Sequence, residues 1–323
     1  MIIQRPLFCQ KNRFVWKNDP TYRFIKPTYL SPPKVVLDDF SIPNSITLPY
    51  YAKTGTKSSW NNNIPLGINN KSKDYDPLLL SGMRNAGKWT AECLKYAETL
   101  VYPGIKSEEI DEKIRKWAFS KNMYPSSLNY GGFNGSCCIS INNIIAHGVP
   151  DKNILCSGDI VNIDIALFVK HPDDPDAHFH GDTSSTFGVG DISKNSKKLI
   201  YYTKKALEAG INECYPGKPF NAIGKAIEAV AKKSGFDVSK YLAGHGIGRE
   251  FHSYPLILHH DNNDSRTMIP GMIFTIEPCL CEGNANDLVL HQDGWSISTS
   301  DGSRCAQFEH TVLITNDGVE ILT

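Results

Sequence analysis

A chain of 323 residues can bury a sizeable core, and it fits one large domain of about 240 to 260 residues with an extension better than two equal domains. Its 34 basic and 34 acidic side chains cancel, which argues against a nucleic-acid or membrane-surface partner. No apolar run approaches the roughly 18 residues of a membrane span, so we expect a soluble, cytoplasmic protein without a membrane partner. Nine cysteines, an odd number scattered along the chain, favour reduced thiols.

Residues 1–80 are predicted to form an extended arm that precedes a catalytic domain at 81–323. The arm contains nine of the nineteen prolines, which restrict the backbone to extended and turn conformations. Four basic residues precede the first acidic residue, Asp19, and give a weak signal for an organelle-targeting leader: Arg5, Lys11, Arg13 and Lys17. An ordinary basic tail is the simpler interpretation, so an organelle is the alternative to the cytoplasm.

From Arg84 onward, two segments match each other at one constant offset, the offset that places Tyr102 on Tyr215. In both, a Tyr-Pro-Gly turn lies between two amphipathic helices, and an apolar strand ending in a carboxylate follows. This duplication predicts two halves related by a pseudo-two-fold axis, with their sheets meeting centrally. Chance similarity is the alternative, because each element is common. The matched pairs are Leu94 and Leu207, Tyr102–Gly104 and Tyr215–Gly217, Ile110 and Ile223, Ile114 and Ile227, and Gly158–Asp164 and Gly271–Glu277.

Two aspartates are predicted to lie on the strands of one hairpin. Asp164 interrupts an apolar run, where an unpaired carboxylate is costly. Asp182 lies in the next extended stretch, after the turn-rich residues 170–176. Both are equidistant from residue 173, so a symmetric hairpin places them directly opposite, with Cβ atoms roughly 4.5 to 5.5 Å apart. A multivalent cation would turn the repulsion between them into attraction.

Three further residues suit the same cation site. Glu277 ends an apolar strand, Glu309 interrupts another, and His245 lies in a Gly-His-Gly-Ile-Gly segment that permits close backbone approach. Each alone could be a salt-bridged or turn residue. Together with the two aspartates they could hold two divalent ions, with a bridging carboxylate from each half and a water of lowered pKa between the ions. This is hydrolase chemistry, and the sequence contains neither a GxSxG nor an HExxH motif.

Over roughly residues 80–323 the chain resembles the type 1 methionine aminopeptidases. Six ordered segments carry the resemblance: Cys138–Gly148, Gly158–Asp164, His180–Ser184, Gly244–Gly248, Phe274–Pro278 and Ala306–Thr311. The resemblance implies an α+β, pita-bread (creatinase/aminopeptidase-like) fold and removal of the initiator methionine from nascent polypeptides with a small second residue. The short separation of His245 and Glu277 leaves no room for the helical insertion of type 2 enzymes.

The resemblance also implies residue roles. The metal ligands would be Asp164, Asp182, His245, Glu277 and Glu309, with Asp182 and Glu309 bridging two ions of Co, Mn, Fe or Zn. The catalytic group would contain His147, His252 and Glu277, and both of its histidines would contact substrate. The methionine pocket would be formed by Tyr130, Phe133, Cys138, Phe251 and Trp295; for each of these, a plain core position is the alternative.

Several expectations depart from the family pattern or compete with it. The segment between Asp164 and Asp182 is longer than usual in type 1 members, and we interpret its additional His171 and His178 as solvated loop residues. The cysteines form no N-terminal zinc module of the kind found in eukaryotic cytosolic members, so we expect at most a transient association with ribosomes. Nothing in the sequence demands a dimer, and we expect a monomeric chain. The rival functions are a prolidase or aminopeptidase P of the same fold, and a catalytically silent binding protein.

Overall fold

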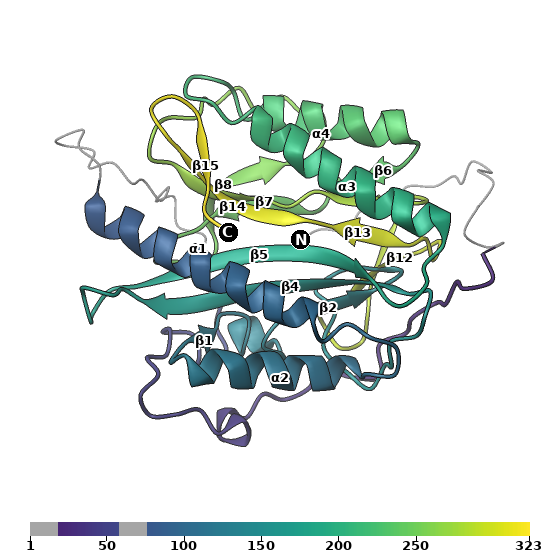
Figure 1. The fold of residues 1–323 in the computed structure, drawn as a ribbon, viewed down its shortest axis with the longest axis horizontal. Coiled ribbons are helices and arrows are strands. Elements are labelled where there is room, and N and C mark those ends of the chain that lie inside the picture. Colours follow the sequence, from purple (N-terminus) through teal and green to yellow (C-terminus); the bar gives the residue numbers. More distant parts are fainter. Residues whose placement is uncertain (1–18, 58–75) are drawn as a thin grey trace.

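A nine-stranded antiparallel sheet forms the centre of the computed structural model, which describes residues 19–57 and 76–323 (Figure 1). The strand order is β1-β4-β5-β14-β9-β7-β8, with β2 on β4 and β15 on β14. These strands are β1 (Tyr124–Pro125), β2 (Cys138–Ile141), β4 (Ile160–Lys170), β5 (His178–Gly188), β7 (Ala243–Gly246), β8 (Ser253–Leu258), β9 (Ile273–Ile276), β14 (Glu309–Ile314) and β15 (Val319–Ile321).

Two three-stranded sheets flank the central sheet, with the orders β13-β10-β6 and β11-β12-β3. Their strands are β3 (Ile144–Ala146), β6 (Asp237–Val238), β10 (Cys279–Cys281), β11 (Leu288–Leu290), β12 (Ile297–Thr299) and β13 (Cys305–Gln307). The small sheet of β13, β10 and β6 also gathers three buried thiols, Cys279, Cys281 and Cys305. The cysteines of the described ranges are free.

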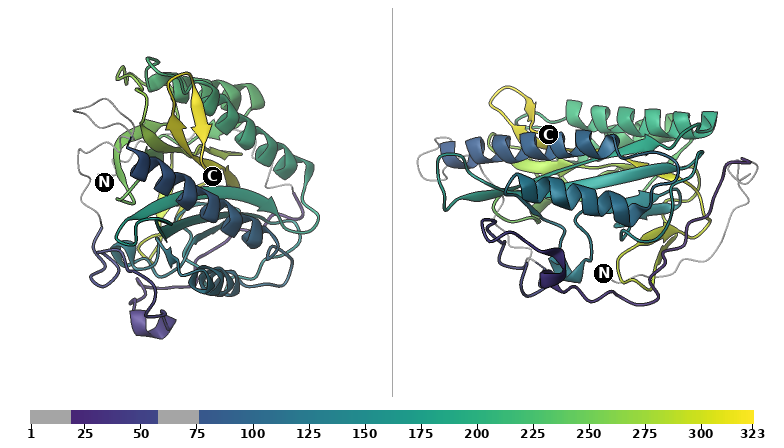
Figure 2. Two further views of the ribbon diagram at one scale, coloured as in Figure 1. Left: turned by 60° about the vertical axis from the view of Figure 1, so that its left-hand side comes forward. Right: turned by 60° about the horizontal axis from the view of Figure 1, so that its bottom comes forward.

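Four helices pack against one face of the central sheet, and residues 19–57 run along the opposite side (Figure 2). The four helices are α1 (Pro77–Glu98), α2 (Ser107–Ser120), α3 (Lys194–Asn212) and α4 (Asn221–Ser234). α1 starts where Asp76 accepts hydrogen bonds from two backbone N–H groups and proline occupies the first helical position. No helix among residues 19–57 and 76–323 is long and apolar enough to cross a bilayer.

The internal repeat is confirmed in detail. The N–H of Gly104 donates to Leu155 at 2.8 Å, and the N–H of Gly217, its partner in the repeat, donates to Met268 at 2.8 Å. Both glycines have positive φ angles, +101° and +83°, which glycine adopts without the Cβ penalty. The two halves meet at the pairing of β5 with β14, where Ser184 lies opposite Glu309. The pseudo-two-fold axis therefore passes through the centre of the sheet.

The register of the β4–β5 hairpin differs from the prediction. Asp164 lies opposite Ser184, and Asp182 lies opposite Ala166. The reason is the turn, which is centred on residue 174 rather than 173, since Lys170 pairs with His178. The two aspartates are therefore diagonal neighbours on one face instead of direct partners, and their side chains still share a hydrogen bond.

The described part of the arm packs on the domain through side chains that bind its backbone. Asn143 exchanges two hydrogen bonds with the backbone of Ile25, at 2.6 and 3.0 Å. Arg304, fully buried, pairs with Asp19 at 2.6 Å. The arm thus belongs to the packed structure where it is described. The proposed basic leader lies in residues 1–18, outside the described residues, and the division of the chain at residue 80 stays a prediction.

Candidate metal centre

Three strands of the central sheet bring together Asp182 from β5, His245 from β7 and Glu309 from β14. Each is buried, and one potential ligand atom from each lies within 4.8 Å of the others. Strand alternation explains the side on which they lie. A Cβ on Gly181 would meet Ala86 of α1 at 2.6 Å, so residue 181 faces the helices and Asp182 faces away from them. The centre therefore lies on the sheet face opposite the helices.

Asp164 and Glu277 complete the group of five. Nε2 of His245 lies 3.6 Å from Oδ2 of Asp182 and 3.7 Å from Oε1 of Glu277. Asp164 shares a hydrogen bond with Asp182. Residues 164 and 277 are partners in the internal repeat; Asp164 lies in β4, and Glu277 directly follows β9, the matching strand. The structure thus gathers all five sequence-predicted residues at the junction of the two halves.

Close backbone packing sets the position of His245. A Cβ on Gly244 would lie 2.2 Å from the carbonyl oxygen of Thr275, and one on Gly246 would lie 2.2 Å from that of Tyr254. Only glycine fits at either place, as the Gly-His-Gly segment predicts. Nδ1 of His245 lies 3.2 Å from the carbonyl oxygen of Gly246. Because a carbonyl only accepts, Nδ1 carries the proton and Nε2 presents its lone pair to the carboxylates.

Two supporting residues were missed by sequence reasoning. The hydroxyl of Thr275 donates to Oε1 of Glu277 at 2.8 Å and accepts from the N–H of His245 at 3.0 Å. Gln307 donates to Oε2 of Glu277 at 3.2 Å. A signal for both existed, because Thr275 and Gln307 each precede an acidic residue by two positions and so share its face of the strand. These contacts orient the Glu277 carboxylate.

The clustered carboxylates raise one another's cost of ionisation. Burial raises the pKa of Asp182 to about 8, against hydrogen bonds from Asp164 and Thr183 that lower it. Burial also raises the pKa of Glu277 to about 8. Burial and the nearby charge of Asp182 together raise the pKa values of Asp164 and Glu309 well above their usual range. Oδ1 of Asp182 is buried and has no hydrogen-bond partner among residues 19–57 and 76–323.

These observations fit a cation site. A buried carboxylate oxygen without a partner is expensive unless something binds it. Divalent cations would satisfy that oxygen and would offset the repulsion among four carboxylates. Oxygen ligands with a single imidazole suit Mn, Fe, Co and Zn alike. The site's chemistry therefore supports metal binding and leaves the metal's identity open.

His147 and His252 lie beside this group. The ring of His252 is 4.2 Å from the ring of His245, and it stacks on Tyr130 at 5.0 Å. His147 follows β3 in the left-handed region, at φ 54°, which is uncommon for a residue with a Cβ and is typical of functional sites. Burial and the charge of Lys57 lower the pKa of His147 to about 4. His147 is therefore a neutral imidazole at neutral pH.

The five residues of the expected methionine pocket form two contacting groups. Tyr130 and Phe251 meet edge to face at 5.1 Å, next to His252. Phe133 meets Trp295 edge to face at 5.3 Å, and Cys138 packs in the same cluster. Cys138 lies directly opposite Asp164 in the pairing of β2 with β4. Cys138 and Phe251 thus lie next to the candidate metal ligands, and Phe251 also contacts His252.

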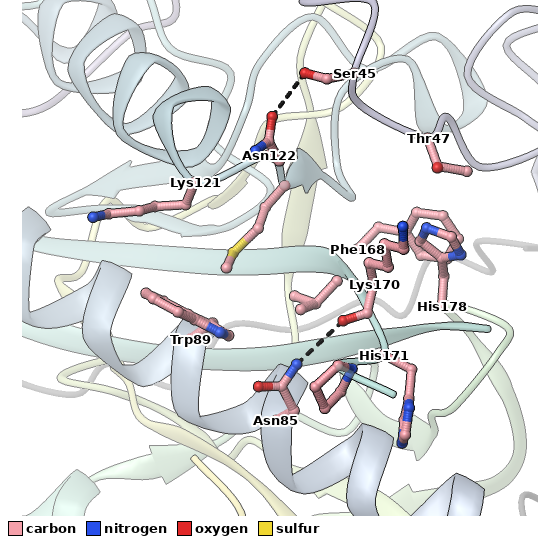
Figure 3. A pocket seen from close by; sticks show the side chains of 13 residues that line it. Ser45, Thr47, Asn85, Trp89, Lys121, Asn122, Phe168, Lys170, His171 and His178 are labelled. Carbon is pink, nitrogen blue, oxygen red and sulfur yellow. Dashed lines mark hydrogen bonds between the residues drawn. The ribbon is translucent and has the colours of Figure 1, made fainter. Parts of the chain in front are cut away.

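A separate cavity of about 600 Å³ lies at the edge of the sheet, between α1, the end of α2 and the β4–β5 hairpin (Figure 3). Its lining includes Trp89, Phe168 and His178, and none of the five candidate ligands contributes to it. His171, which also lines it, was expected to be solvated and is in fact buried, because Ser81 and two backbone N–H groups of the turn hydrogen-bond its ring. His178 is half-buried and stacks on Phe168.

Comparison with known proteins identifies the family. Residues 81–316 match the model of metallopeptidase family M24. The organellar methionine aminopeptidase 1D of Arabidopsis thaliana is 42% identical over 257 residues, covering 80% of this chain and 71% of the relative. The mitochondrial methionine aminopeptidase 1D of Danio rerio is 37% identical over 317 residues, covering 98% of this chain and 87% of the relative. The chain belongs to the type 1 methionine aminopeptidases.

Solved structures agree with this membership of the methionine aminopeptidase family. The methionine aminopeptidase of Rickettsia prowazekii superposes with a TM-score of 0.71 at 41% identity, covering 75% of this chain and 95% of that one. A prolidase from Pyrococcus furiosus reaches a TM-score of 0.56 at 20% identity, which shows the shared fold alone. The pita-bread fold and the metallo-aminopeptidase family expected from the sequence are confirmed, and the prolidase alternative has weaker support.

Proposed function

We propose that this methionine aminopeptidase removes the initiator methionine from nascent polypeptides whose second residue is small. The observation that carries the proposal is the group of Asp182, His245 and Glu309, whose ligand atoms lie within 4.8 Å of one another beside an aromatic cluster. The proposal extends the family membership to a metal count, a substrate class and a set of residue roles.

Two divalent ions would be held by Asp164, Asp182, His245, Glu277 and Glu309, with Asp182 and Glu309 bridging. Bound ions of this kind supply an activated water at neutral pH and polarise a carbonyl. The chain's own groups would do the rest. The neutral ring of His252 would hydrogen-bond the scissile carbonyl oxygen, His147 would lie near the departing amide, and Glu277 would stay oriented by Thr275.

The methionine side chain would enter a pocket formed by Tyr130, Phe133, Cys138, Phe251 and Trp295. Aromatic edges pack favourably on a thioether, and a narrow slot admits an unbranched side chain. The site should therefore reject β-branched residues, and each missing methylene should cost roughly 1 to 3 kcal/mol in transition-state binding.

The test compares kcat/KM for matched peptides that begin Met-Ala, Leu-Ala, Val-Ala and Met-Leu, with metal added at several concentrations. Met-Ala should be cleaved fastest, and both Val-Ala and Met-Leu should be poor substrates. Comparable rates for Val-Ala and Met-Ala would make the enzyme a broad aminopeptidase. Preferred cleavage of Xaa-Pro peptides would instead support the prolidase alternative. Metal analysis of the same samples counts the ions for each chain.

The cellular location also belongs to the proposal. The names of several relatives contain the word mitochondrial or chloroplastic. In this chain, four basic residues precede Asp19, the first acidic residue. We therefore favour an organelle over the cytoplasm that the lack of a long apolar run first suggested. Fluorescent fusions of the whole chain and of residues 19–323 test this, because only the whole chain should enter the organelle. Transient ribosome association and the monomeric state stay predictions.

A further inference from the structure

We propose that Lys57 of the N-terminal arm is a specificity-determining residue that attracts acidic side chains of the substrate just beyond the scissile bond. This inference rests on the proposed function. It concerns a residue outside the family match, which begins at residue 81.

A turn of the arm, residues 50–57, is docked on the segment that forms one wall of the expected pocket. Tyr51 is fully buried, its hydroxyl donates to the carbonyl of Ser126 at 2.6 Å, and its ring meets that of Tyr130 at 5.0 Å. Asn129 donates to the carbonyl of Ala52 at 2.6 Å. These contacts hold the turn, with Lys57 at its end, against the wall.

The side chain of Lys57 extends from this turn across the wall. Its aliphatic part passes over Gly131, where an added Cβ would lie 2.5 Å from Cε of Lys57. Its Nζ atom lies 4.3 Å from the ring centroid of Trp295, a cation–π distance. Trp295 in turn meets His147 at 5.9 Å. The ammonium group therefore lies at the rim of the pocket, next to a histidine that we place near the departing amide.

The charge is available to a ligand. Lys57 is exposed, and no carboxylate of the described ranges forms an ion pair with it. Burial lowers the pKa of His147 most, and the positive charge of Lys57 lowers it further. The same charge lowers the pKa of His252 too, after burial and the charges of three neighbouring histidines.

The direction of the substrate follows from the burial of the pocket. The methionine side chain would occupy the buried aromatic walls, so the rest of the peptide must leave past the exposed rim where Lys57 lies. An ammonium there would attract a carboxylate on the third or fourth residue of the substrate and would repel a lysine.

The test uses amidated pentapeptides that begin Met-Ala and carry Glu, Gln or Lys at the third or at the fourth position. At the more sensitive position, kcat/KM should fall from Glu to Gln to Lys, by roughly two- to five-fold for each step, as is typical of an exposed ion pair. The difference should lie in KM, because the contact exists in both the ground and transition states, and it should shrink at about 0.5 M salt.

Two variants and one control decide the outcome. Lys57→Gln should remove the preference, and Lys57→Glu should reverse it. Lys53→Gln, at an exposed lysine of the same arm, should leave it unchanged. If all Met-Ala peptides are cleaved and the preference is the same in wild type and both Lys57 variants, the inference is overturned. If the metal-loaded enzyme cleaves none of them, the proposed function fails instead. Equal unfolding temperatures show that the variants are folded.

Discussion

The two halves of the sheet contribute the same number of carboxylates by different routes. In the N-terminal half, Asp164 and Asp182 come from adjacent strands of one hairpin, β4 and β5. In the C-terminal half, Glu277 follows β9 and Glu309 starts β14, and the chain between them forms β10 to β13. Antiparallel pairing of β9 with β14 nevertheless brings Glu309 close to Glu277. Strand pairing, rather than closeness in the sequence, therefore places these residues.

The halves differ at one matched position of the strands that flank β4 and β9. Asn162 of β4 and Thr275 of β9 are partners in the repeat. Asn162 lies opposite Ser140 of β2, whereas Thr275 accepts a hydrogen bond from the backbone N–H of His245 on β7. The imidazole thus belongs to the C-terminal half alone. We expect the two metal positions to be chemically unequal, one with oxygen ligands only and one with a nitrogen ligand.

The largest effect should come from the residues proposed to bridge the halves. Asp182→Asn or Glu309→Gln should lower turnover by several orders of magnitude, because each would remove a charged ligand shared by both ions. Activity and bound metal are measured at saturating Mn or Co. Asp173→Asn, an exposed acid of the same hairpin, is the control and should remain active. Near-normal turnover in either variant would remove that residue from the site.

Histidine substitutions should separate metal binding from substrate contact. His147→Ala and His252→Ala should each reduce kcat by about 10²- to 10⁴-fold while both ions remain bound, because hydrogen-bond or acid–base assistance contributes that much. His245→Ala should release one ion and keep the other. The measurement is metal content alongside single-substrate kinetics. Loss of metal from the His147 variant would make that residue a ligand and contradict the assignment.

The supporting residues should have smaller effects that differ between the halves. Thr275→Val and Gln307→Leu should each weaken metal binding by roughly 10- to 100-fold, because both hold the Glu277 carboxylate. Asn162→Ala should weaken it less, since Asn162 donates to the carbonyl of Gln307 at 2.9 Å instead. Calorimetric titration of the metal-free proteins with Mn²⁺ gives the affinities. Equal losses in all three variants would mean that the halves support the site equally.

The smallest effect should reveal the symmetry of the scaffold. Gly104→Ala and Gly217→Ala should each lower the free energy of unfolding by about 1 to 2 kcal/mol, because both positions require a left-handed backbone and have open space around them. Gly318→Ala, which also has open space and lacks a positive φ, is the control. Chemical denaturation measures all three. A clearly unequal pair would show that the halves carry different strain at this turn.

Much of the architecture could be predicted from the sequence because its signals are local or periodic. The constant offset between matching segments predicts the two halves, because the same helical spacing of apolar residues recurs in both. The structure buries all four of the matched isoleucines fully: Ile110, Ile114, Ile223 and Ile227. Carboxylates inside apolar strands predict a charged centre, because burial of an acid needs a partner. The six family-like segments predict which acids belong to it. These inferences need no knowledge of how distant strands pair.

Only the tertiary structure decided the contacts between remote segments. The hairpin register depended on a turn centred one residue later than expected, and that single shift made Asp164 and Asp182 diagonal neighbours. The burial of His171 depended on Ser81, which lies far back along the chain in α1. The approach of Lys57 to Trp295 joins the arm to the segment between β11 and β12, near the other end of the chain. Such contacts leave no periodic trace, because their geometry depends on the simultaneous packing of elements whose order in space differs from their order in the chain.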